Sequence, residues 1–249
     1  MPADSLALVT GTSSGIGAAV AKQLLQRGWE VAGVARRTPP IENARYHHLA
    51  IDLQHVPAAV ASIQSRFGAL VAERGWQRIG LVNNAARAAP LGPVEKLDAQ
   101  ELERSYAVNA AMPIWLMGFV VQHSPRDAMV RIVNLSSGAA VRAFPGLAAY
   151  CSSKAALRMA GMVLAAELDS PSRPAAAPHV AILSYEPGVV DTEMQRATRS
   201  KSRGEFPWVE TFQGFAAQGM LVAPEIPAAE IVEFLEADSR AHFIERRRP

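Results

Sequence analysis

The sequence has 249 residues, of which 49% are hydrophobic and 19% are charged, and this length and composition suit one α/β domain with a sizeable core. Its 25 basic and 23 acidic side chains nearly balance at a net charge of +2, which gives no electrostatic reason to expect a nucleic-acid or membrane-surface partner. The single cysteine, Cys151, excludes an internal disulfide and is compatible with a reducing cytosol.

From the composition we expect neither a signal peptide nor a membrane span. Residues 1–5 are too polar for a signal peptide, and the longest apolar run, residues 112–121, is too short to cross a bilayer. We interpret the basic cluster at residues 246–248 as a solvated end of the chain. We therefore expect a cytoplasmic protein with no metal site.

A short apolar run at residues 6–9 predicts a buried strand, followed by a glycine-rich turn and a helix to residue 27. In such a turn Gly11 permits the sharp bend, Gly15 lets the backbone approach a pyrophosphate, and Gly17 lets the helix pack on the strand. The helix N-terminus would present free N–H groups to the anion. A glycine-rich turn is often only a turn, but its place between a first strand and a helix favours a dinucleotide site. The residues expected to contact the cofactor here are Gly11, Ser13, Ser14, Gly15, Ile16 and Gly17.

A second strand is predicted at residues 30–35, directly before Arg36 and Arg37. In NAD binders an acidic residue near this point hydrogen-bonds the ribose 2′-OH. Two arginines suit a 2′-phosphate instead, because guanidinium groups form charge-assisted, bidentate bonds with phosphate. Arg37 reads equally well as an exposed loop residue, whereas Arg36 favours NADP(H) over NAD(H).

A third strand is predicted at residues 46–51 and ends in Asp52 and Leu53, both expected to line the cofactor site. The Asp52 carboxylate would accept from the adenine amino group or merely cap a turn. Helical periodicity follows at residues 56–74.

Residues 75–80 read as a connection, and residues 81–85 predict a fourth strand that ends in Asn83, Asn84 and Ala85. Amides in this position can brace neighbouring backbone or touch a ribose. Either role places them at the carboxyl edge of the sheet, where open sheets bind ligands, so we expect Asn83 and Ala85 to contact the cofactor.

One long helix is predicted at residues 98–122, with Asp98 as N-cap and Glu101 three residues later. Pro113 should kink it or perturb its hydrogen bonding. Asn109 stands among apolar neighbours, and a buried amide needs partners. It is therefore either a structural hydrogen-bonder or part of a proton path, and the pattern does not choose between them.

A fifth strand at residues 130–135 delivers Ser136 and Ser137 at its carboxyl end, and the next helix carries Tyr150 and Lys154. Residues four apart share one helix face, so the amine and the phenol meet. A phenol has a pKa of about 10, and an ammonium beside it favours the phenolate and eases proton transfer near neutral pH. The spacing alone is more typical of a solvated helix face, and the rest of the sequence is what favours the catalytic interpretation.

A sixth strand is predicted at residues 179–185 and is ended by Pro187 and Gly188. Backbone N–H groups beyond this point, with Val190 and Thr192, could hold the nicotinamide carboxamide and the phosphates. The stretch 193–224 carries much apolar surface and reads either as a substrate lid or as ordinary core and interface packing.

The remaining elements are a surface loop at residues 170–178, a helix at 227–237 and a last short edge strand at 242–245. Strands that alternate with helices in this way predict a doubly wound parallel sheet of about seven strands with helices on both faces. No linker or repeat divides residues 1–249, so we expect a single domain.

Several motifs occur in a fixed order along the chain: Thr10-Gly-x-x-x-Gly15-x-Gly17, Asn83-Asn84-Ala85, Asn109, Ser137, Tyr150-x-x-x-Lys154 and Pro187-Gly188. This series resembles the short-chain dehydrogenase/reductase family from end to end, which implies a Rossmann-type domain. The gap of thirteen residues (150 − 137) matches the family's serine to Ser137 rather than Ser136. Ala86 departs from the glycine that the family usually has there, but it removes no reacting group.

A finer resemblance, carried by residues 183–195, 218–222 and 241–242, is to sepiapterin reductases and the bacterial benzil reductases grouped with them. Sepiapterin reductases carry an aspartate near the C-terminus that grips the pterin, and no aspartate follows His242 here. Glu245 could substitute if the register slips by one. The simpler interpretation is that the anchor is lost, which favours a smaller or more apolar carbonyl such as an aryl diketone and leaves pterin reduction as the alternative.

The resemblance implies that a substrate carbonyl oxygen lies between Tyr150, the proton donor, and Ser137, which stabilises the developing charge. Lys154 would lower the pKa of Tyr150 and bind ribose hydroxyls, and Asn109 would hold a water that connects Lys154 to solvent. The residues expected around the substrate are Ser137, Tyr150, Phe144, Gly188, Met194 and Trp208.

The implied activity is NADP(H)-dependent reduction of a small-molecule carbonyl. A homodimer or homotetramer would pair through the helices that contain Met112 and Leu157, as similar proteins do. Two other classes stay open: an NADP-binding sensor without turnover, and a scaffold whose main role is association.

Overall fold

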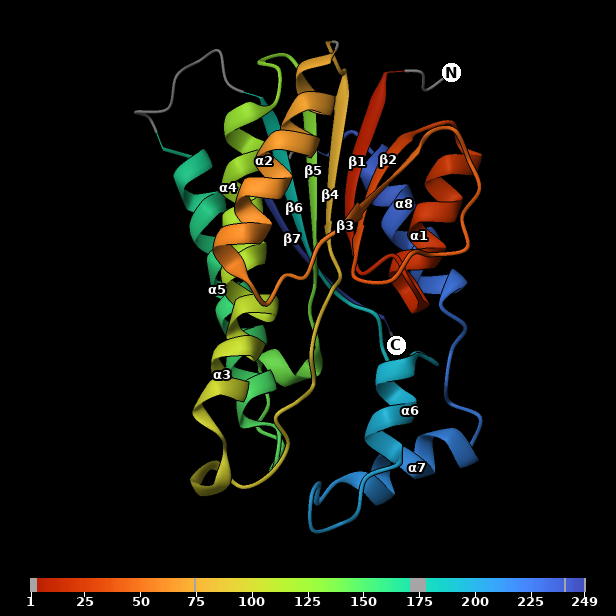
Figure 1. Cartoon of the computed structure of the whole chain (residues 1–249), viewed down its shortest axis with the longest axis vertical. Coiled ribbons are helices and arrows are strands. Elements are labelled where there is room, and N and C mark those ends of the chain that lie inside the picture. The colour runs from red at the N-terminus through yellow and green to blue at the C-terminus, as the bar shows by residue number, and fades with distance from the viewer. Residues whose placement is uncertain (1–3, 74, 171–177, 240, 249) are drawn as a thin grey trace.

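The computed structural model describes residues 4–73, 75–170, 178–239 and 241–248. Its strands are β1 (Ser5–Thr10), β2 (Glu30–Ala35), β3 (Tyr46–Ala50), β4 (Arg78–Asn83), β5 (Met129–Leu135), β6 (His179–Glu186) and β7 (Phe243–Arg247). They form one parallel sheet in the order β3-β2-β1-β4-β5-β6-β7 (Figure 1). The order reverses direction between β1 and β4, which opens a crevice beyond the carboxyl ends of these strands.

Helices cover both faces of the sheet (Figure 1). Those on one face are α2 (Val56–Glu73), α4 (Met112–His123) and α5 (Ala148–Leu168), and those on the other are α1 (Gly15–Gln26) and α8 (Glu225–Glu236). A hydrophobic core lies on each face of the sheet, and alternate residues of each strand point into the two cores. In β1, Leu6 and Leu8 pack into the core on the α2, α4 and α5 side, and Ala7 and Val9 into the core on the α1 and α8 side. A strand buried on both faces reads as a continuous apolar run, which is why β1 was predictable. The prediction of a doubly wound parallel sheet is confirmed.

Short elements lie beyond the carboxyl ends of the strands, in the lower part of Figure 1. They are the 3₁₀ turns η1 (Val94–Lys96) and η3 (Gly138–Ala140), the π-helical turn η2 (Ala107–Ala111), and the helices α3 (Ala99–Tyr106), α6 (Glu193–Arg199) and α7 (Val209–Ala217). The predicted surface loop at 170–178 falls largely outside the described residues. Within the described part of the chain, no helix is long and apolar enough to cross a membrane.

The fourth strand differs from the prediction, since it begins at Arg78 and ends at Asn83 rather than running from 81 to 85. Its first residue is polar because the guanidinium of Arg78 leaves the sheet to bind Asp238 at 2.8 Å. Gly80 looked like a loop residue, but a Cβ there would lie 3.2 Å from a methyl group of Leu235 and 3.4 Å from the ring of Trp29. A small residue in this strand therefore allows α8 to approach the sheet.

The helix predicted at 98–122 is interrupted, and it forms α3, the π-turn η2 and α4 in succession. Asp98 caps α3 as predicted, with its carboxylate accepting from the N–H of Glu101 at 2.9 Å. Pro113 has no N–H to donate to the carbonyl of Asn109, four residues earlier, and the backbone widens there into a π-turn. The perturbation expected from Pro113 is thus confirmed, and it falls on the turn that carries Asn109.

Candidate active site

Tyr150 and Lys154 lie on the first two turns of α5, and Ser137 follows the carboxyl end of β5. The side chain of Ser137 hydrogen-bonds to Tyr150. The Lys154 ammonium lies 5.7 Å from the centre of the Tyr150 ring and donates to the carbonyl of Leu135 at 2.6 Å. The end of β5 and the start of α5 therefore bring together the three side chains that the sequence motifs had singled out.

Burial shifts the two titratable groups of this cluster in opposite directions. Burial raises the pKa of Tyr150 to about 12, although the hydrogen bond from Ser137 opposes the rise. Burial also lowers the pKa of Lys154 to about 8. Removal from water disfavours the charged forms of both groups, so burial decides the direction of both pKa shifts, and the effect of Lys154 on the pKa of Tyr150 stays a prediction. The phenol keeps its proton at neutral pH, which is the state that a proton donor requires.

Asn109 holds three segments together through its amide. Its Oδ1 accepts from the N–H of Arg87 at 2.8 Å, and its Nδ2 donates to the carbonyl of Arg87 at 2.8 Å. The same Nδ2 lies 3.1 Å from the hydroxyl of Ser153, the neighbour of Lys154. The amide thus fixes the segment after β4 against η2 and α5, so the structural interpretation of Asn109 has direct support.

The glycine turn between β1 and α1 is tight and leaves the helix N-terminus open. A Cβ at Gly17 would lie 2.4 Å from the carbonyl oxygen of Gly11, and Gly15 has a φ of +58°. Ser14 precedes α1 without capping it through its side chain, and the first turn holds no acidic residue. The first N–H groups of α1 are therefore available to an external anion, so the residues present fit the pyrophosphate of a dinucleotide.

The two asparagines at the end of β4 brace the structure. Asn84 donates from Nδ2 to the carbonyl of Thr10 at 2.8 Å. The side chain of Asn83 is only 2% exposed and donates to Asn134 Oδ1 at 2.8 Å. This amide therefore braces β4 against β5, and the contact expected between Asn83 and the cofactor stays a prediction.

Of the two arginines after β2, Arg37 forms an ion pair with Glu193, whereas Arg36 acts through its charge on Asp52. Arg37 donates from Nη2 to the carboxylate of Glu193, the first residue of α6, at 2.7 Å. Asp52 accepts from the N–H of Gln54 at 3.0 Å, which supports its turn-capping interpretation. Burial raises the pKa of Asp52, but the bonds from Gln54 and the charge of Arg36 outweigh it and hold that pKa below its ordinary value. Leu53 beside it is buried.

The segment after β6 reaches back to the glycine turn. Gly188 turns the chain with a φ of +75° after Pro187, and Val190 forms a bridge with Val222. Thr192 caps α6 by accepting from the N–H of Gln195 at 3.3 Å. Its methyl group would lie 3.1 Å from a Cβ at Gly15, so the start of α6 rests against the turn expected to hold the pyrophosphate.

An aromatic cluster connects the stretch 193–224 with Tyr150. The rings of Phe144 and Trp208 meet edge to face, with centres 5.4 Å apart. Both pack with Tyr150 against the buried cluster of Leu147, Phe206 and Val209. The predicted substrate residues Phe144 and Trp208 thus lie on the same apolar cluster as Tyr150, whereas Met194 lies on α6.

A cavity of about 260 Å³ adjoins Ser137, and both polar and apolar residues line it. The charged and hydroxyl side chains that line it include Ser136, Ser137, Arg158, Ser184, Glu186 and Glu245. Glu245 is ion-paired there, since both of its carboxylate oxygens accept from Arg158, at 2.6 and 2.8 Å.

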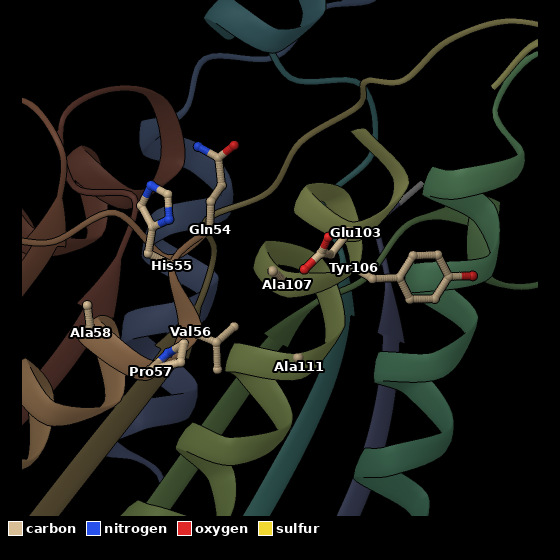
Figure 2. A pocket seen from close by; sticks show the side chains of 9 residues that line it. All are labelled: Gln54, His55, Val56, Pro57, Ala58, Glu103, Tyr106, Ala107 and Ala111. Carbon is tan, nitrogen blue, oxygen red and sulfur yellow. The ribbon is translucent and has the colours of Figure 1, made fainter. Parts of the chain in front are cut away.

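A larger hollow of about 560 Å³ lies away from these residues (Figure 2). On one side it is lined by Gln54 and His55, near the start of α2, and on the other by Glu103 and Tyr106 of α3. None of the catalytic candidates lines it.

Three residues of this region, Thr10, Arg87 and Glu193, were given no site role by the sequence reasoning. Thr10 accepts at Oγ1 from the N–H groups of Asn84 and Ala85, both at 3.0 Å, and its place at the end of β1 before the glycine turn was a usable signal. Arg87 donates to both Gln54 and Glu101, and Glu193 accepts from Arg37. No local pattern marks the last two, because their partners come from distant segments.

The profile of the family described as short chain dehydrogenase matches residues 5–203. The chain belongs to the short-chain dehydrogenase family. A benzil reductase ((S)-benzoin forming) of Bacillus subtilis is 32% identical to it over 232 residues, which cover 93% of each chain. A sepiapterin reductase of Mus musculus is 32% identical over 265 residues and 96% of each chain. A solved structure of a short-chain dehydrogenase/reductase from Burkholderia vietnamiensis, 33% identical, superimposes with a TM-score of 0.67 over 80% of this chain and 90% of that one.

Membership of the short-chain dehydrogenase family makes the protein an oxidoreductase that acts on carbonyl or alcohol groups with a nicotinamide cofactor. The crevice described above is where such a cofactor meets a substrate in a doubly wound sheet.

Proposed function

We propose that this protein is an NADPH-dependent carbonyl reductase that reduces a ketone or a benzil-like diketone, with Tyr150 as the proton donor. The observation that carries this proposal is the protonated hydroxyl of Tyr150 beside the hydroxyl of Ser137, with Lys154 one turn further along α5. A pocket that reduces a carbonyl needs a proton source and a second donor for one oxygen atom, and this pair supplies both.

A nicotinamide held in the crevice would supply the hydride for reduction of the carbonyl carbon. Tyr150 gives its hydroxyl proton to the carbonyl oxygen as negative charge develops there, and Ser137 donates a hydrogen bond to the same atom. Lys154, charged below a pKa of about 8, stabilises the phenolate that remains. Asn109 fixes the backbone beside Lys154, and a water held near it would return a proton from solvent.

The proposed cofactor contacts follow from the same crevice. The open N-terminus of α1, with Ser13, Ser14 and Ile16, would bind the pyrophosphate, and Val190 and Thr192 would face the nicotinamide end. Arg36 would bind the 2′-phosphate, and Arg37 would contribute once it leaves Glu193. This is the basis for proposing NADPH rather than NADH.

Two features bear on the substrate. The aromatic cluster beside Tyr150 suits an aryl ketone or diketone, and we propose the stretch 193–224, with Trp208 and Met194, as the lid over it. Two relatives are named benzil reductases, and benzil is an aryl diketone. Both carboxylate oxygens of Glu245 accept from Arg158, which supports the interpretation that the pterin anchor is lost.

Pterin reduction is the second candidate, because the cavity beside Ser137 is lined by polar groups that could bind a polar heterocycle. A panel of benzil, simple ketones and sepiapterin, each with NADPH and with NADH, separates the candidates by initial rate. No turnover of any member by a protein that binds NADPH would instead support a nucleotide sensor.

The decisive variant is Tyr150→Phe. Loss of the proton donor should lower turnover by at least about 10²–10³-fold, while NADPH binding measured by fluorescence stays nearly unchanged because the ring remains. Ser137→Ala should lower turnover on the same scale. Wild-type turnover by Tyr150→Phe would remove Tyr150 from the mechanism.

A further inference from the structure

The start of α6 is tied to the cofactor side of the sheet by one carboxylate. Glu193 accepts from Arg37 at 2.7 Å, although 156 residues separate them along the chain. The bond from Arg37 lowers the pKa of Glu193 most, and a hydrogen bond from Ser14 adds to it. Thr192 alongside contacts the position of Gly15. The first residues of α6 therefore rest on the glycine turn and on the loop after β2.

Glu193 makes with Arg37 the kind of contact that a 2′-phosphate would make. Carboxylates and phosphates both bind a guanidinium through paired anionic oxygens, so the two groups are alternatives for one fork of donors. A phosphate placed beside the ionised Glu193 would also be repelled by it. The Arg37–Glu193 pair is open to exchange, because both side chains are more than half exposed, at 66% and 55%, and exposed ion pairs contribute little stability.

We propose that Glu193 is a specificity-determining residue that competes with the 2′-phosphate of NADP(H) for Arg37. The competition weakens binding of the phosphorylated cofactor and leaves NAD(H) unaffected. It rests on the proposed placement of the 2′-phosphate beside Arg36 and Arg37. Capture of Arg37 by the phosphate breaks the Arg37–Glu193 bond, whereas the bond from Ser14 and the contact of Thr192 with the Gly15 turn still hold the start of α6.

The test measures nucleotide binding by calorimetry, with adenosine 2′,5′-bisphosphate and 5′-AMP as probes that differ only in the 2′-phosphate. Because Glu193 also bonds Ser14 in the turn expected to bind the 5′-phosphate, Glu193→Gln should tighten the bisphosphate by about three- to tenfold more than 5′-AMP, and this difference should shrink at high salt. Glu210→Gln is the matched control, since Glu210 is another exposed lid carboxylate, 3.5 Å from Arg203 and not bonded to Arg37. It should change neither affinity.

The route through Arg37 is tested by repeating Glu193→Gln in an Arg37→Ala background, where this difference should vanish. Unchanged bisphosphate affinity in Glu193→Gln, equal tightening of both probes, or a difference that persists without Arg37 would each overturn the competition. A wild-type protein that binds the bisphosphate no more tightly than 5′-AMP would instead remove the proposed NADPH preference, and tightening by Glu193→Gln would still support the competition.

Discussion

Burial shifts the pKa values of Tyr150 and Lys154 in opposite directions, because it disfavours the charged form of each. The same removal from water that keeps the phenol protonated brings the pKa of the amine down to about 8. Because that pKa lies below the ordinary value of 10.5, the unfolded chain binds more protons between pH 8 and 10.5, and the contribution of Lys154 to the unfolding free energy rises with pH in this window.

Catalysis should have the opposite dependence on pH. The kcat/KM for carbonyl reduction should fall as pH rises through about 8, because uncharged Lys154 no longer stabilises the phenolate that Tyr150 leaves. A profile of kcat/KM against pH measures the pKa in the free enzyme. Lys154→Arg keeps its charge throughout this range and should lose that limb, and a limb that stays in the variant would belong to another group.

Among the elements, the π-turn η2 is the one that most directly joins fold and site. Pro113 disrupts the helix at Asn109, and the amide of Asn109 then occupies both backbone groups of Arg87. The guanidinium of Arg87 in turn binds Gln54 and Glu101. The loop after β4 is therefore held from both its backbone and its side chain.

Asn109→Ala should lower the free energy of unfolding by about 2–3 kcal/mol, because the N–H and C=O of Arg87 both lose their amide partner. Urea denaturation measures the change. Gln122→Ala, an exposed amide near the end of α4, should change it by less than about 0.5 kcal/mol. Equal stabilities for the two variants would show that the Asn109 bonds contribute nothing net.

At the scale of the whole molecule, the outer faces of α4 and α5 are unusually apolar for a surface. Ile114, Met159 and Val163 are 41%, 54% and 49% exposed, with Met162 beside them. Proteins of this family are commonly oligomeric, and these two helices are the ones expected to pair subunits. We propose a dimer or tetramer assembled on this face.

Met159→Glu should shift the protein toward the monomer, because a carboxylate buried between subunits lacks a partner. Size-exclusion chromatography with light scattering reports the mass. Met220→Glu makes the same substitution at a methionine that is 51% exposed beyond α7, and it should leave the assembly intact. Dissociation by both or by neither variant would contradict an interface on α4 and α5.

The sequence predicted those parts of the molecule that depend on local patterns. Buried strands such as β1, the glycine turn and the one-turn spacing of Tyr150 and Lys154 needed no tertiary information. The predicted start of β4 was wrong because glycine and arginine are typical of loops. Their place in a strand is explained only by the packing of α8 against Gly80 and the bond from Arg78 to Asp238. The Glu193–Arg37 bond joins positions 156 residues apart, and nothing near either residue indicates the other.

The outer strand β7 is the last in the described sheet, and its free side offers unpaired N–H and C=O groups. Such a border is a template on which a strand of another chain can add. Here Arg246 and Arg247 are both exposed, and although Arg247 lies 3.4 Å from Glu186, two copies approaching edge to edge bring these cationic side chains together. Replacing both arginines with threonine would remove this charge repulsion. The protein should then associate into fibril-like stacks through β7.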